Sequence, residues 1–199
     1  VRDVNESAWH VSDFNSISNN GNNWWCGNEE DNGYLDNWFQ YLDTPTITIG
    51  SNTVLSADMK WAIEDFNSVN VAGTCADGWD QANVQISTDS GLTWSVISSD
   101  SDPYDFQCGY GSLSNGFDGM PGWGDIQDWH NVTFDLNDYS NQTIKIRFAF
   151  YSDVGWSVGD DADLTGLQVD NIEISGSGSQ YFFNDADNNS EINAMSASG

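Results

Sequence analysis

The stretch Thr-Ile-Lys-Ile-Arg-Phe-Ala-Phe-Tyr, residues 143–151, alternates apolar with polar side chains over most of its length. Ile144, Ile146, Phe148 and Phe150 fall on one face, and Lys145 and Arg147 fall on the other. This period of two predicts a half-buried β-strand. Residues 167–175 repeat the pattern after an acidic loop, so we predict a second strand there.

The second stretch places Asp170 among the apolar residues of 169–174. An unpaired carboxylate in such a position is costly, so it needs a partner. Only 4 of the 199 residues are Lys or Arg. A metal ion is therefore a candidate partner for Asp170.

The chain has 31 acidic side chains against 4 basic ones, a formal net charge of −27. Such a surface repels nucleic acids and anionic membranes, and it attracts divalent cations or cationic partners. Adaptation to a salty medium is an equally good explanation of the charge. No apolar run is long enough to span a bilayer, so we expect no membrane insertion.

The abundance of Asn, Asp, Ser and Gly, with few Lys, favours a secreted or cell-surface protein. The chain begins at Val1 and carries no signal-like segment. We expect either a processed mature protein or a part of a longer one.

Residues 83–97 contain the clearest local motif. The pattern Ser87-x-Asp89-x-Gly91-x-Thr93-Trp94 matches the Asp-box hairpin residue for residue. Gly91 suits the positive φ of a bulged hairpin, and Asp89 can accept hydrogen bonds from the amides of the turn. Asp-boxes are structural, so we assign Asp89 no catalytic role.

Three cysteines allow one disulfide and leave one thiol. Cys75 precedes the hairpin and Cys108 follows it, which favours their pairing and leaves Cys26 free or paired elsewhere. The cysteines show no Cys-x-x-Cys spacing, so a zinc site is not expected.

Several aromatic residues are candidate contacts for a glycan or a protein. Trp24 and Trp25 interrupt a polar loop, although in an all-β protein such a pair more often fills the core. The long Gly/Asp/Ser-rich loop at 98–128 carries Tyr110 and Trp123. The four candidates are Trp24, Trp25, Tyr110 and Trp123.

We divide the chain into a domain at 1–175 and an extension at 176–199. Gly176-Ser177-Gly178-Ser179 has the composition of a linker. The following Asp185-x-Asp187-Asn188-Asn189 resembles part of a calcium loop but lacks the Gly and Glu spacing of an EF-hand. We expect this acidic tail to dock on the domain or on a neighbour.

The ordered set of motifs resembles a MAM-like jelly-roll module. Similar modules are attached to secreted immune inhibitor A-like metallopeptidases and form the cleaved-adhesin domains of gingipains. The resemblance covers about residues 9–175 and rests on Trp24-Trp25-Cys26-Gly27, Trp38-x-Gln40-x-Leu42-x-Thr44-Pro45-x-Ile47, the Asp-box, Phe134-Asp135-Leu136-x-x-Tyr139, Lys145-Ile146-Arg147-Phe148-x-Phe150-x-Ser152-Asp153 and Val169-Asp170-Asn171-Ile172-Glu173-Ile174.

The resemblance implies an all-β, two-sheet antiparallel jelly-roll sandwich with long loops and no catalytic centre. It also implies a calcium ion on Asp170. The first strand pairs beside the last in such folds, which makes Asp13 the candidate co-ligand. The acidic loop is either a second calcium site or a solvated surface loop; its carboxylates are Asp153, Asp160, Asp161 and Asp163.

We therefore expect a noncatalytic extracellular calcium-binding module that mediates adhesion or binds a glycan or a surface protein. The alternative is a structural subunit of an extracellular filament or surface assembly, in which copies dock through the tail. A hydrolase with two carboxylates is a weaker third possibility. The peptidase domain of the related proteins is absent, because the sequence contains no His-Glu-x-x-His and both histidines are isolated.

Overall fold

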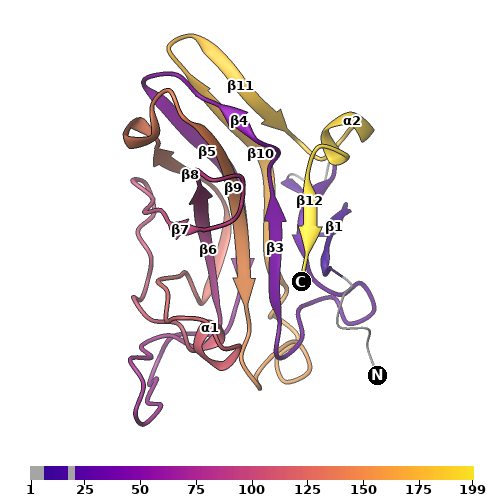
Figure 1. The fold of residues 1–199 in the computed structure, drawn as a ribbon. Coiled ribbons are helices and arrows are strands. Elements are labelled where there is room, and N and C mark those ends of the chain that lie inside the picture. The colour runs from indigo at the N-terminus through magenta and orange to yellow at the C-terminus, as the bar shows by residue number, and fades with distance from the viewer. Residues whose placement is uncertain (1–6, 18–20) are drawn as a thin grey trace.

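The computed structural model describes residues 7–17 and 21–199, which form a sandwich of two antiparallel sheets (Figure 1). Within these residues each sheet has six strands. In the first sheet the order is β1 (Trp9–Ser12), β2 (Asn23–Cys26), β10 (Gly166–Gly176), β5 (Thr53–Ala62) and β8 (Ile126–Asp135), with β11 (Ser179–Asn184) also paired to β10. The predicted all-β, two-sheet sandwich is thus confirmed, and its strand order is consistent with a jelly roll.

In the second sheet the order is β12 (Ser196–Ser198), β3 (Phe39–Asp43), β9 (Thr143–Tyr151), β6 (Gln81–Ser87) and β7 (Ser95–Val96). The short strand β4 (Ile47–Thr48) pairs with the start of β9. The helices are short: α1 (Tyr110–Ser114), α2 (Asn189–Ile192) and the 3-10 turn Asn137–Tyr139.

Strand β9 follows the predicted alternation. The side chains of Ile144, Ile146, Phe148 and Phe150 are fully buried between the sheets. On the outer face Arg147 lies between the rings of Tyr41 and Trp94, 4.0 and 3.9 Å from their centroids. Arg147 also donates two hydrogen bonds to the Asp43 carboxylate, at 2.7 and 3.0 Å. The outer face of the strand is therefore stabilised by Arg147, which is paired with a carboxylate and stacked between two aromatic rings.

Three of the four aromatic residues that the sequence offered as ligand contacts lie in the interior. Trp24, Trp25 and Trp123 are buried, and each indole N–H donates to an oxygen of the protein. Tyr110 is half-buried at the start of α1, with its ring edge-on to Trp79. A buried indole offers no face to a ligand, so these three Trp residues act as core side chains.

The Asp-box forms the expected turn between β6 and β7. Asp89 Oδ1 accepts hydrogen bonds from the backbone N–H groups of Leu92 and Thr93, and Oδ2 accepts one from the Thr93 hydroxyl. These hydrogen bonds, that of the Thr93 side chain first, lower the pKa of Asp89 to about 2. The carboxylate is thus occupied in holding the turn.

The segment interpreted from sequence as a linker is a tight hairpin turn between β10 and β11. Ser177 and Gly178 both have positive φ, 49° and 81°, as a type I′ turn requires. The tail then packs on the sandwich: Ala186 and Met195 are buried, and β12 extends the second sheet beside β3. Residues 176–199 are thus part of the sandwich, because glycines and serines that suit a linker also suit a hairpin.

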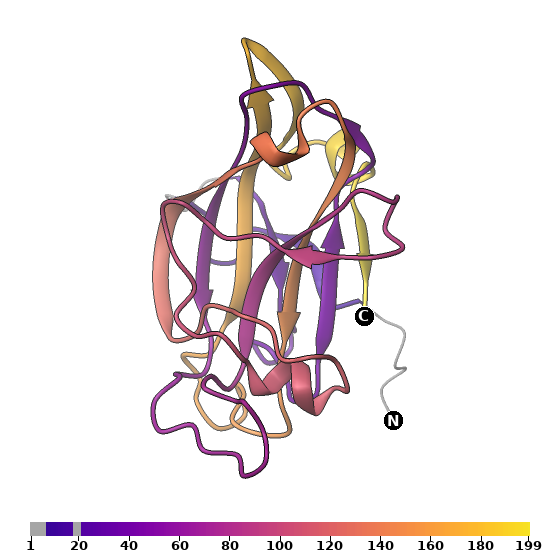
Figure 2. The same cartoon turned by 60° about the vertical axis from the view of Figure 1, so that its left-hand side comes forward.

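A disulfide joins Cys75 to Cys108, the pairing that the sequence favours, while Cys26 is a buried free thiol. The disulfide ties the loop after β5 to the segment before α1. Both segments lie at the end of the sandwich where β9 also ends (Figure 2). No helix among the described residues is long and apolar enough to cross a membrane.

Candidate metal centre

Three strands deliver carboxylates to this end of the sandwich. Glu64 lies two residues after β5, Asp80 directly precedes β6, and Asp153 lies two residues after β9. Strands β6 and β9 are antiparallel with Gln81 opposite Tyr151, which brings Asp80 and Asp153 to the same edge. Strand β5 belongs to the other sheet, so the three side chains bridge the two layers.

The carboxylates converge closely. One oxygen from each of Glu64, Asp80 and Asp153 lies within 4.8 Å of the other two. Asp80 is fully buried, and its Oδ1 accepts a hydrogen bond of 2.7 Å from the backbone N–H of Asp153. In the part of the chain that the structure describes, Asp80 Oδ2 and Glu64 Oε2 are buried without a close hydrogen-bond partner, although the Tyr34 hydroxyl lies near enough to the Asp80 carboxyl to lower its pKa somewhat. Buried polar atoms are rarely left in that state, so these oxygens need a proton or a cation.

The surroundings disfavour the ionised form of all three groups. Burial, followed by the charge of Asp153, raises the pKa of Asp80 well above its ordinary value. Burial and the charges of four nearby Asp residues, Asp153 first, raise the pKa of Glu64 to about 8. Burial also raises the pKa of Asp153. No cationic side chain is among the causes of these shifts.

The size of the repulsion decides what the site holds at neutral pH. Two unit charges 4.8 Å apart repel by about 3.5 kcal/mol at an effective dielectric constant of about 20. Three such pairs sum to about 10 kcal/mol, which is comparable with the entire stability of a typical domain. The three groups therefore cannot all stay ionised and unpaired, and either protons or a cation must occupy the site.

The donor set is made only of oxygen. Hard cations such as Ca²⁺ and Mg²⁺ prefer carboxylate and carbonyl oxygens, whereas Zn²⁺ and Cu²⁺ favour imidazole or thiolate ligands. Tyr34 places a hydroxyl oxygen beside the three carboxylates. This hydroxyl accepts a hydrogen bond from the Glu64 backbone N–H at 3.0 Å and donates one to the Trp156 carbonyl at 3.5 Å. The residues thus fit a hard divalent cation.

The acidic loop that the sequence singled out divides into two parts. Asp153 belongs to the converging group. Asp160 is exposed but is close enough for its charge to raise the pKa of Glu64. Asp161 and Asp163 are exposed, and Asp161 Oδ1 accepts the backbone N–H of Asp163 within the loop. They form a solvated surface turn, which was one of the two readings open from sequence.

Asp170 lies outside this group. It is buried on the face of β10 opposite the core-facing Val169, with Asp58 across from it on β5. Burial, with added charge from Asp187, Asp185 and Asp58, raises its pKa to about 7. The tail thus brings further carboxylates near Asp170, but among the described residues no three carboxylates there converge as they do at Asp80.

The strand pairing from which Asp13 was predicted as a co-ligand of Asp170 differs from the observed one. Strand β1 pairs with β2, and β2 pairs with β10, so one strand separates the first strand from the last. Asp13 is also exposed. The prediction assumed that the first and last strands are neighbours, which β2 prevents.

Glu64 and Asp80 were not predicted from sequence as site residues. Each lies in a polar segment next to a strand, which is where solvated carboxylates are common. The available signal was position: Glu64, Asp80 and Asp153 each lie within two residues of a strand end. Using that signal requires knowing which strand ends meet, and this depends on the topology of both sheets.

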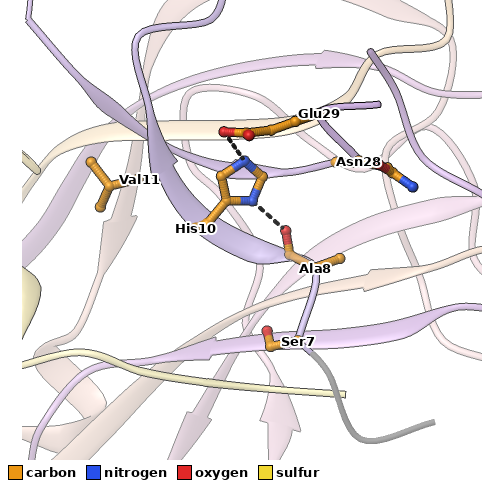
Figure 3. Close-up of a pocket in the computed structure, with 7 residues that line it drawn as sticks. Ser7, Ala8, His10, Val11, Asn28 and Glu29 are labelled. Atoms are coloured by element: carbon orange, nitrogen blue, oxygen red, sulfur yellow. Dashed lines mark hydrogen bonds and ion pairs between the residues drawn. The ribbon is translucent and has the colours of Figure 1, made fainter. Parts of the chain in front are cut away.

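A shallow groove of about 470 Å³ beside β1 contains Ser7, His10 and Glu29, the residue types of a hydrolytic triad (Figure 3). His10 directs Nδ1 to the Ala8 carbonyl at 2.9 Å and Nε2 toward Glu29 Oε1 at 3.5 Å. The Ser7 hydroxyl donates to Gln40 Oε1 at 3.4 Å instead. No hydrogen bond joins His10 to Ser7 in this structure, so the three side chains do not form the hydrogen-bonded chain of a triad.

No protein-family model and no curated protein matches this chain. The resemblance to MAM-like modules therefore stays a prediction from sequence motifs.

Proposed function

We propose that this chain is a noncatalytic β-sandwich module that binds calcium at Glu64, Asp80 and Asp153 and serves in adhesion or ligand binding outside the cell. The observation that carries the proposal is Asp80. Its carboxyl is fully buried, one of its oxygens has no close hydrogen-bond partner among the described residues, and two more carboxylate oxygens lie within 4.8 Å. A divalent cation satisfies all of these groups at once.

Calcium fits the setting better than magnesium. Calcium accepts six to eight oxygen ligands in irregular geometry, whereas magnesium requires a near-ideal octahedron and keeps several waters. Here the ligands come from three separate strand ends in two sheets, and carboxylates can bind calcium through one oxygen or two. Such an assembly is easier to fit around the larger and more tolerant ion.

The extracellular setting is supported by the Cys75–Cys108 disulfide, since disulfides persist in oxidising compartments. The noncatalytic assignment is supported by the groove at His10, where the imidazole faces a backbone carbonyl and a carboxylate rather than a nucleophile. A rigid sandwich whose loops are anchored by a metal ion is best suited to a role in binding.

The alternative, a structural subunit docked through its tail, was based mainly on the ordered tail, and this support is now weaker. The ordered tail is accounted for within one chain, because β11 pairs with β10 and β12 pairs with β3. We therefore favour the binding module.

Isothermal titration calorimetry on chelator-treated protein tests the proposal. We expect calcium binding in the wild-type protein that is abolished by Asp80→Asn. Asp170→Asn is the matched control, because Asp170 is also a buried carboxylate with a raised pKa. Retention of calcium binding in Asp170→Asn places the ion at Asp80, whereas full binding in Asp80→Asn would refute the assignment.

A further inference from the structure

The loop between β9 and β10 exposes two apolar side chains directly beside the candidate metal centre. Val154 is 65% exposed and Trp156 is 55% exposed, although Asp153 immediately before them is buried. Six of the other nine Trp residues are buried in the core. An exposed Trp contributes nothing to the core of its own domain, and exposed apolar groups of this kind often mark an interaction site.

The backbone at Trp156 has an unusual conformation. Its φ of 66° lies in the left-handed region, which bulky residues rarely occupy. Two residues at the metal centre hold the loop in place. Asp153 Oδ1 accepts the Gly155 N–H at 2.9 Å, and Tyr34 contacts the loop through its hydroxyl and through its carbonyl, which accepts the Val158 N–H. A strained backbone that the surrounding contacts maintain points to a function for the side chain it presents.

The described segments that surround this loop carry acidic side chains and no basic ones. Segments 28–36, 64–66 and 152–165 contain no Lys or Arg. Their exposed carboxylates include Asp36, Asp65, Asp160, Asp161 and Asp163. Charge complementarity therefore favours a cationic occupant and opposes nucleic acids and anionic membranes.

We infer that residues 153–158 form a docking site for a protein segment that presents Lys or Arg, with Trp156 and Val154 as its apolar anchors. This inference rests on the proposed function, because bound calcium fixes Asp153 and hence the loop. The indole face of Trp156 contacts the aliphatic stem and the charge of the cationic side chain. The neighbouring carboxylates pair with further cations of the same segment.

Fluorescence anisotropy with calcium-loaded protein at about 0.15 M ionic strength tests this inference. The probe is a short labelled Lys-rich peptide, with a Glu-for-Lys peptide of equal length as its control. We expect Trp156→Ala to weaken binding of the Lys-rich peptide about tenfold, the size of a well-formed cation–π contact with its packing. Leu92→Ala is the matched control, because Leu92 is an exposed apolar residue on the Asp-box hairpin, and we expect it to leave the affinity unchanged.

Unchanged affinity in Trp156→Ala overturns the inference, because binding then arises from diffuse charge alone. Binding of a neutral oligosaccharide through Trp156, without binding of the peptide, also overturns it. A nuclear magnetic resonance titration gives a second readout: the indole N–H signal that disappears in Trp156→Ala must shift when peptide is added to the wild type. Calcium stabilisation, measured separately in both proteins, distinguishes failure of this site from failure of the metal centre.

Discussion

Replacing Asp80 with Asn changes the charge of the candidate metal centre while keeping its shape. The Asn side-chain oxygen can still accept the backbone N–H of Asp153, which lies 2.7 Å from Asp80 Oδ1. The Asn side-chain amide then takes the place of Oδ2, close to the carboxylates of Glu64 and Asp153. The substitution thus removes a buried charge and a metal ligand together.

Without metal, we expect Asp80→Asn to be more stable than the wild type. Burial and the charge of Asp153 raise the pKa of Asp80 well above its ordinary value, so the wild-type protein must either bind a proton there or bear the repulsion of a neighbouring carboxylate. One such repulsion amounts to about 3.5 kcal/mol at 4.8 Å. Asn carries no charge and needs no proton, so the free energy of unfolding in chelator should rise by about 2–4 kcal/mol.

With calcium, the order should reverse. A ligand present at a thousand times its Kd stabilises the wild type by about 4.1 kcal/mol, which exceeds the advantage of the variant in chelator and raises Tm by about 8–16 °C for a chain of this length. The variant gains little, because it lacks the ligand that lies at the centre of the group.

Differential scanning calorimetry of both proteins, in chelator and in excess calcium, measures the crossover. Two results would refute the reasoning. One is a wild-type Tm that is the same in calcium and in chelator. The other is an Asp80→Asn variant that is destabilised equally in both conditions, because that would mark Asp80 as a structural side chain alone.

Three further predictions concern pH, the disulfide and the core. The raised pKa of Glu64, about 8 against an ordinary 4.5, means that the folded state binds more protons than the unfolded state between these values. Chelator-treated protein should therefore lose stability as pH rises from about 5 to 8, and calcium should abolish the loss; denaturant titrations over pH check this. Replacing Cys75 and Cys108 with Ser opens a loop whose ends are 33 residues apart and should cost about 4 kcal/mol in the free energy of unfolding, measured by urea unfolding. Phe148→Ala empties a fully buried position and should cost about 3–5 kcal/mol, whereas the exposed control Leu92→Ala should change little.

The sequence predicts the strands and the Asp-box hairpin because their signals are local. The alternation at 143–151 reports directly which side chains face the core, and the Asp89 pattern encodes hydrogen bonds within a few residues. The tail was harder to predict, because Gly176 to Ser179 suit a linker and a type I′ turn equally well. Only the pairing of β11 with β10 distinguishes the two.

The metal centre depends on contacts that the sequence does not encode locally. Glu64, Asp80 and Asp153 are spread over about ninety residues and converge because β5 and β9 end where β6 begins. Asp170 drew attention because it interrupts an apolar stretch, which is a local signal of burial. Burial alone does not supply neighbouring ligands, and the strand expected to supply them, β1, is separated from β10 by β2.

The most direct test of the central claim is a crystal structure of the protein grown in calcium. The account predicts an ion bonded to oxygens of Glu64, Asp80 and Asp153 at about 2.3–2.6 Å. A structure in which these carboxyl groups hydrogen-bond to one another or to water, with calcium absent from the site or bound at Asp170 instead, would contradict it.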